Sequence, residues 1–256
     1  MVGVSRRSRS VKLGMILALV PAHARILAVG VEGDGGYSAG CSDTGNQIER
    51  GLLRGGSDLT AVAYLAAPLS LRAEGATLMR ADGKLLPFVD GSFDVVISNA
   101  VVEHIGGPGE ARRFLAESQR VARTLVIHTT PNRWFPIETH TRLPLLHWLP
   151  RRLHPKLFGQ NSNYRWGHGD WLFSGRELVA LSPGGRLIGG WPRWWPMSLV
   201  AAWPSPPTRA SPADPASVAI GGGAGAGAPP GHRAPAEARV QPSSDSATGE
   251  GSGADR

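Results

Sequence analysis

Three polar residues, Asn99, Glu103 and His104, follow a short, nearly all-apolar run at residues 95–98. The run is rich in β-branched residues and follows a turn at 90–92, a pattern typical of a central parallel strand covered on both faces. In an open α/β sheet, ligands bind in the crevice beyond the carboxyl ends of the strands. The three side chains are therefore well placed to contact a ligand, although Asn99 and Glu103 could instead cap the next helix.

A second candidate site is the glycine-rich turn at 30–36, which follows an apolar run at 26–29. This order predicts a first strand that runs into a loop whose backbone can approach a ligand closely. The turn does not fit a dinucleotide-binding fingerprint, because Ser38 stands where the third glycine is required. A plain flexible loop is the alternative interpretation.

The middle of the chain carries a close succession of motifs. They are Asp82 with Leu86-Pro87-Phe88, the segments 91–96 and 99–104, an amphipathic segment at 111–122 and an apolar run at 124–128. Together they resemble class I S-adenosylmethionine-dependent methyltransferases of the type 11 group, over about residues 25–202. The resemblance implies an α/β fold with a Rossmann-like, doubly wound, mostly parallel sheet. It also implies a C-terminal antiparallel hairpin, formed by the runs at 185–190 and 197–202.

The resemblance further implies S-adenosylmethionine as the cofactor. It places Asp82 and the backbone of Gly83 at the adenine, with the Asp82 carboxylate accepting from the exocyclic amine. It places Asn99 beside the methionine portion. These positions match the family's motifs residue by residue.

The first two strands depart from the family pattern. Ala28 stands where the family has an acid, and no acid occurs between residues 59 and 73, where the family holds both ribose hydroxyls. Gly30 opens the first loop, and either Glu32 or Asp34 would supply a carboxylate toward the methionine amino group. A lost charged hydrogen bond costs about 1.5–3 kcal/mol, so a weakened cofactor site is expected.

The segment that follows the fifth strand, about 129–170, is dense in Pro, His, Arg and Trp and is interpreted as a lid over the cofactor. In it Trp134 and Phe135 would exclude water, and the acceptor would be faced by Asn132, Glu138, His140 and Arg142. Methyl transfer is an in-line displacement in which the protein aligns the nucleophile and can supply a base. His104 and His140 are the candidate catalytic bases.

The sequence therefore predicts a methyltransferase that moves a methyl group to a small-molecule, glycan or lipid-linked acceptor. The alternative is a non-catalytic methyltransferase-like binding or partner protein with a degenerate cofactor site. A nucleotide-sugar or dinucleotide enzyme on a similar fold is disfavoured by the failed fingerprint.

Composition bounds the domain organisation of this 256-residue chain. An apolar content of 41% suffices for one core, which we assign to 25–203. Residues 204–256 are rich in Pro, Ala, Gly and Ser and predict a disordered tail. Residues 1–24 resemble a signal peptide, but a helix packed on the sheet explains the same residues and is preferred.

The charge, cysteine and histidine content of the chain limit its expected binding partners, location and metal content. The net charge of +7 is dispersed and forms no basic stripe, so nucleic-acid binding is not expected, whereas an anionic substrate or a lipid surface would fit. Cys41 is the single cysteine, which favours a reducing, cytoplasmic location. The eight histidines lack metal-ligand spacing, so no metal is expected.

A cluster of Trp191, Trp194 and Trp195 precedes the last expected strand. Core packing, acceptor contact and a peripheral membrane contact are its three interpretations, of which core packing is the commonest for tryptophan.

Overall fold

The computed structural model describes residues 2–33, 46–64, 69–138, 144–149 and 171–205. Asp34, His140, much of the expected lid and nearly all of the expected tail lie outside these ranges. The domain boundaries given above therefore stay predictions.

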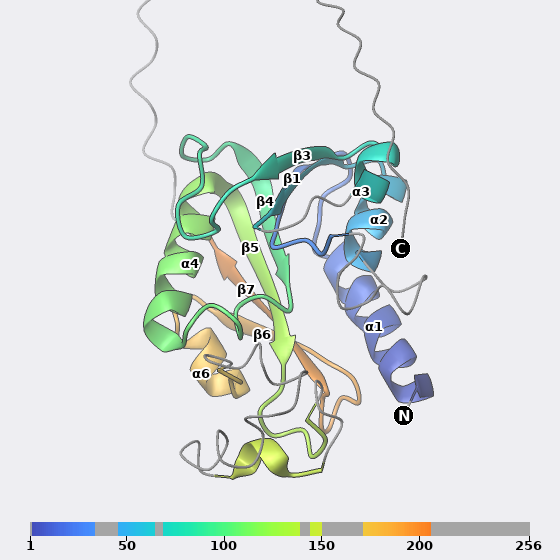
Figure 1. Ribbon diagram of the computed structural model, residues 1–256, viewed down its shortest axis with the longest axis vertical. Coiled ribbons are helices and arrows are strands. Elements are labelled where there is room, and N and C mark those ends of the chain that lie inside the picture. Colours follow the sequence, from blue (N-terminus) through green and yellow to red (C-terminus); the bar gives the residue numbers. More distant parts are fainter. Residues whose placement is uncertain (1, 34–45, 65–68, 139–143, 150–170, 206–256) are drawn as a thin grey trace, which may run out of the picture. The chain divides into compact units, whose positions relative to one another are not determined.

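Helices and strands alternate along the described chain (Figure 1). The helices are α1 (Val2–Leu17), α2 (Gln47–Arg54), α3 (Leu69–Ala73), α4 (Pro108–Val121), the 3-10 helix η1 (Leu146–Trp148) and α6 (Gly175–Val179). The strands are β1 (Arg25–Val29), β2 (Asp58–Ala63), β3 (Thr77–Arg80), β4 (Phe93–Asn99), β5 (Ala122–Pro131), β6 (Arg186–Gly189) and β7 (Ser198–Pro204).

The strands form one seven-stranded sheet in the order β3-β2-β1-β4-β5-β7-β6. Strands β1 to β5 pair in parallel, whereas β7 is antiparallel to both β5 and β6. This arrangement confirms the predicted doubly wound sheet with its antiparallel hairpin. Strands β2 and β3 lie on one side of β1, and β5 lies on the other side of β4. The strand order therefore reverses between β1 and β4, and this topological switch point is where such sheets bind ligands.

Both faces of the sheet are covered. Figure 1 shows α1, α2 and α3 on one face and α4 and α6 on the other. Alternation within β1 explains the two cores, because Ile26 packs in the cluster that contains Ile16 of α1, while Leu27 packs in the cluster that contains Phe114 of α4. The covering helices thus leave the strand ends available for a site.

Local sequence signals explain several element boundaries. Ser174 and Glu177 form a complete capping box at α6, as their spacing predicts. Helix α4 begins at Pro108, three residues before the expected segment, because proline is well suited to a first helical turn. Its N-cap is Gly107 with no side-chain hydrogen bond, so Asn99 and Glu103 do not cap it.

Candidate active site

Asn99 lies at the carboxyl end of β4, beside the switch point. Its Oδ1 accepts hydrogen bonds from Lys12 Nζ at 2.6 Å and from Thr129 Oγ1 at 2.8 Å. Thr129 is the register partner of Asn99 in β5, whereas Lys12 comes from α1. The N-terminal helix therefore contributes a cation to the carboxyl edge of the sheet.

Burial strongly perturbs this cation. Desolvation lowers the pKa of Lys12 to about 8, although the nearby Glu103 and Glu49 carboxylates oppose the shift. Burial also raises the pKa of Glu49, which lies in the first turn of α2. Glu49 Oε2 is buried and receives no hydrogen bond from the residues that the structure describes.

The loop after β1 is held by its neighbours. Gly30 has φ +79°, a left-handed conformation, and a Cβ there would lie 2.5 Å from Val101 Cγ2 in the turn after β4. Only glycine meets both conditions without strain. Asn46 fixes the next part of the loop, since its Nδ2 donates to the Glu32 carbonyl at 2.8 Å and its Oδ1 accepts from the Glu32 N–H at 3.1 Å.

Asp82 and Gly83 follow β3 and approach the same place. A Cβ on Gly83 would lie 2.8 Å from Val29 Cγ1 at the end of β1 and 2.5 Å from Phe114 Cε2. Asp82 is exposed, and its Oδ1 accepts the Lys84 backbone N–H at 2.9 Å. The loops after β1, β3 and β4 therefore meet at one edge of the sheet.

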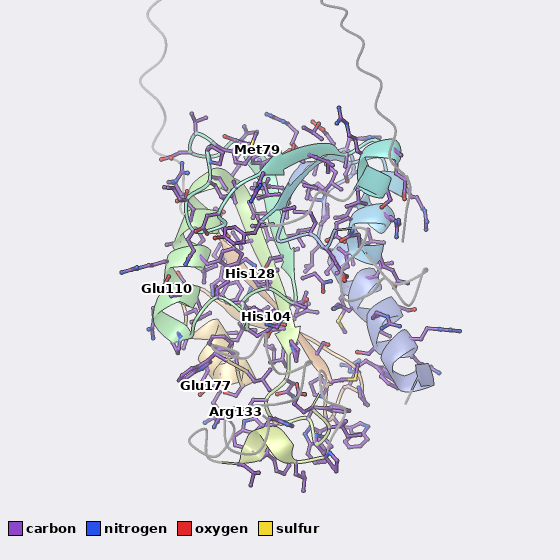
Figure 2. All side chains as sticks on the ribbon, viewed as in Figure 1. Met79, His104, Glu110, His128, Arg133 and Glu177 are labelled. Carbon is purple, nitrogen blue, oxygen red and sulfur yellow. The ribbon has the colours of Figure 1, made fainter. Side chains whose placement is uncertain are left out.

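His104 lies in the turn after β4 rather than on a helix (Figure 2). Its side chain is 38% exposed, and its Nε2 is 3.9 Å from Oε1 of the fully buried Glu103. Glu103 Oε2 in turn accepts from Thr130 Oγ1 at 3.0 Å. A half-exposed imidazole thus stands beside a carboxylate anchored to β5.

Asn132 has a different role from the predicted one. It is buried, its Nδ2 donates to the Pro196 carbonyl at 2.8 Å, and its Oδ1 accepts the Trp134 N–H at 3.0 Å. The reason is that β5 continues to Pro131, so Asn132 closes the end of a strand and does not face an acceptor.

Sequence reasoning missed Lys12 and Glu49. A signal existed for Lys12, because Ser8, Lys12 and Ile16 are spaced four residues apart and share one face of α1, on which Ser8 and Ile16 are buried and Lys12 is half-buried. Lys12 is also one of three lysines among the 27 basic residues. Glu49 offered no comparable signal.

In the part of the chain that the structure describes, no group of three or more His, Cys, Asp or Glu side chains is arranged to hold a metal ion.

Comparison with known proteins bears on the class of this fold. Residues 38–125 match the family model described as a methyltransferase domain. No curated protein matches the chain.

Solved structures with the same fold were also found. A Thermotoga maritima protein named as an S-adenosylmethionine-dependent methyltransferase, a possible histamine N-methyltransferase, is 16% identical over 79% of this chain and 92% of its own, with a TM-score of 0.51. A Methanosarcina mazei S-adenosylmethionine-dependent methyltransferase is 17% identical over 74% and 96%, with a TM-score of 0.50. A Rhodobacter sphaeroides protein named as a Zn-dependent alcohol dehydrogenase is 12% identical over 74% and 87%, with a TM-score of 0.51. At these identities the likeness concerns the fold alone.

The methyltransferase domain matched over residues 38–125 and the order of the strands agree with the resemblance seen in the motifs. S-adenosylmethionine is the cofactor that this match indicates. The site suits that molecule, because the methionine portion carries a carboxylate, an ammonium and a sulfonium. Lys12 and the buried Glu49 and Glu103 carboxyl groups are of the types that would complement these charges.

Proposed function

We propose that the chain transfers the methyl group at the carboxyl ends of β1 and β4 to a small-molecule, glycan or lipid-linked acceptor. The observation that supports this most is the position of Asn99, which joins Lys12 to Thr129 beside the switch point. Gly30 opens the facing loop from β1. The cofactor-binding residues in this proposal are Gly30, Glu32, Asp82, Gly83 and Asn99, with Lys12 and Glu49 added.

The methionine portion would be held by charges that replace the acid absent at Ala28. In this assignment Lys12 pairs with the carboxylate, and Glu49 Oε2 accepts from the ammonium. Both groups are already desolvated. Their electrostatic attraction to the ligand would therefore be stronger than that of a solvent-exposed pair at the same distance.

The adenine would be held by Asp82. Its Oδ1 is used by the Lys84 N–H, so Oδ2 is the oxygen assigned to the exocyclic amine. Gly83 brings its backbone close to Val29, which leaves no room for a side chain between the loops after β3 and β1.

The cofactor supplies an electrophilic methyl group on a sulfonium sulfur. The acceptor atom would be aligned by the turn at 99–104, and His104 would take the proton that the acceptor loses. Because Nε2 faces Glu103, Nδ1 is the nitrogen assigned to this transfer. The Glu103 carboxylate would stabilise the resulting imidazolium, which makes Glu103 a positioning residue.

Calorimetric titration of the full chain with S-adenosylhomocysteine tests the site without an acceptor. Micromolar binding by the wild type and at least about tenfold weaker binding by Lys12→Met are expected, since a charged hydrogen bond is lost. Arg113→Met is the control, because Arg113 is exposed and pairs with Glu110 within α4 at 3.1 Å, outside the assigned contacts.

Two results would contradict the proposal. Equal binding by Lys12→Met would remove Lys12 from the site. Absence of binding by folded wild-type protein would favour the non-catalytic alternative. In that case Val101, which lies against Gly30, would close the loop after β1 to the cofactor.

A further inference from the structure

A group of large apolar side chains is exposed beside the candidate active site. We call it the tryptophan surface. It consists of Trp134, Leu145, Trp148, Leu149, Trp194 and Trp195. Trp194 is 82% exposed and Trp195 37%, so core packing is the wrong interpretation for these two residues, whereas Trp191 is half-buried.

Two segments far apart in the sequence build this surface. One leaves β5 at Pro131, and the other enters β7 at Ser198, which is the register partner of Pro131. Asn132 joins them through its hydrogen bond to the Pro196 carbonyl, and Trp195 Nε1 donates to the Trp134 carbonyl. The two segments therefore meet at the carboxyl end of β5, whose place in the fold is seen in Figure 1.

The exposed part of these side chains is mostly carbon. The Trp148 indole N–H donates to the Arg133 carbonyl at 2.9 Å, and that of Trp195 is bonded as described above. Trp134 and Trp148 pack with ring centroids 6.1 Å apart, and Trp194 and Trp195 with centroids 6.3 Å apart. Contiguous exposed apolar area of this kind marks an interaction site.

Basic residues accompany the aromatic ones. The Arg133 guanidinium lies 5.4 Å from the Trp134 ring centroid, and that of Arg7 on α1 lies 5.8 Å from the Trp191 ring centroid. Arg193 is exposed between Trp191 and Trp194 in the sequence, whereas Glu138, in the segment after β5, is buried. Arg133 also pairs with Glu177 of α6 at 3.3 Å, so Arg7 and Arg193 carry the positive charge that would meet an anionic partner.

From these features we infer that the tryptophan surface docks on the headgroup region of an anionic lipid bilayer. Tryptophan and leucine flanked by arginine suit this region, where indole rings sit at the headgroups and arginine meets phosphate. A peripheral contact is required, since no helix among the described residues is long and apolar enough to cross a bilayer.

Docking in this way would bring the carboxyl edge of β4 and β5 to the bilayer. Figure 2 shows Arg133 below His104, and Arg133 follows the end of β5 at Pro131. A lipid-linked acceptor could then enter the site without leaving the bilayer. This consequence, unlike the docking itself, rests on the proposed function.

Vesicle sedimentation of the full chain tests the inference. The wild type should bind phosphatidylcholine vesicles that contain about one-third phosphatidylglycerol, and bind pure phosphatidylcholine more weakly. The double variant Trp194→Ser/Leu145→Asn should bind about tenfold less. Leu145 has φ +57°, which asparagine adopts readily, so this variant should fold normally.

Val89→Ser is the matched control, because Val89 is 78% exposed and lies before the amino end of β4, at the opposite edge of the sheet. Arg193→Gln should reduce the preference for anionic vesicles. Raised salt should weaken binding in the same way.

Three outcomes would overturn the inference. They are equal vesicle binding by the double variant and wild type, no binding of the wild type to either vesicle, and a wild-type dimer in solution that the double variant makes monomeric. The last would assign the surface to a second copy of the chain. Binding of S-adenosylhomocysteine is measured on the same samples, so loss of docking with intact ligand binding separates this inference from the proposed cofactor site.

Discussion

Lys12 shows how a single residue type can matter in a buried site. An arginine would stay charged at any accessible pH, whereas burial lowers the pKa of Lys12 to about 8. The lysine is therefore charged below that pH and increasingly neutral above it. Arginine, which the chain has at most of its basic positions, would not lose its charge at this helix position.

This titration predicts a pH dependence of ligand binding. If Lys12 pairs with the ligand carboxylate, the affinity advantage of wild type over Lys12→Met should shrink as pH rises through about 8. The amino group of S-adenosylhomocysteine changes its protonation with pH in the same way for both proteins, so its effect cancels in the ratio of the two dissociation constants. A constant ratio of the two dissociation constants across this range would contradict the pairing.

Asp82 provides a second prediction at the residue scale. Asp82→Asn retains an oxygen for the Lys84 N–H but presents an amide donor to the adenine amine. Affinity for S-adenosylhomocysteine should fall by about 1.5–3 kcal/mol, with little change in unfolding free energy. Binding that stays at the wild-type level, measured by calorimetry on folded protein, would move the adenine away from Asp82.

At the scale of elements, α1 is a structural part of the sheet's cover and the source of Lys12. Ile16 is fully buried in the cluster beneath α1, whereas its neighbour Leu17 is 38% exposed. Ile16→Ala should therefore cost about 2–5 kcal/mol of unfolding free energy, and Leu17→Ala less than about 1 kcal/mol. Urea denaturation of the two variants measures the difference, and equal small costs would mean that α1 does not pack on the sheet.

The elements also show what the sequence could predict. Strands β1, β4 and β5 are buried on both faces, and their apolar runs were recognisable for that reason. Strand β3 lies at one end of the sheet, contains no buried residue and has no such apolar run in its sequence. The approach of Lys12 to Asn99 could not be predicted, because it depends on how α1 crosses a sheet whose strands are distant in sequence.

At the scale of the whole molecule, the two cores share the central strands, and a histidine lies inside one of them. His128 of β5 is fully buried and stacks on Phe114 of α4 with ring centroids 5.0 Å apart (Figure 2). Its Nδ1 is 2.6 Å from Ser98 Oγ on β4. The histidine therefore fastens the two strands that carry Asn99 and Thr129, and its protonation would affect the entire fold.

Acid should destabilise the protein through this residue. Burial lowers the pKa of His128 from 6.5 to about 3. Between these two pH values the unfolded chain therefore binds a proton that the folded chain does not bind. Its contribution to stability is complete above pH 6.5 and declines as pH falls toward 3, by about 1.4 kcal/mol per pH unit. The double variant Ser98→Ala/His128→Phe removes both polar partners, so no hydroxyl is left unbonded. Urea denaturation across this range should show that the unfolding free energy falls less per pH unit for the variant than for wild type. The difference between the two slopes should correspond to the uptake of close to one proton on unfolding. Because the remaining groups titrate in both proteins, parallel curves would mean that His128 is already protonated or solvated in the folded state.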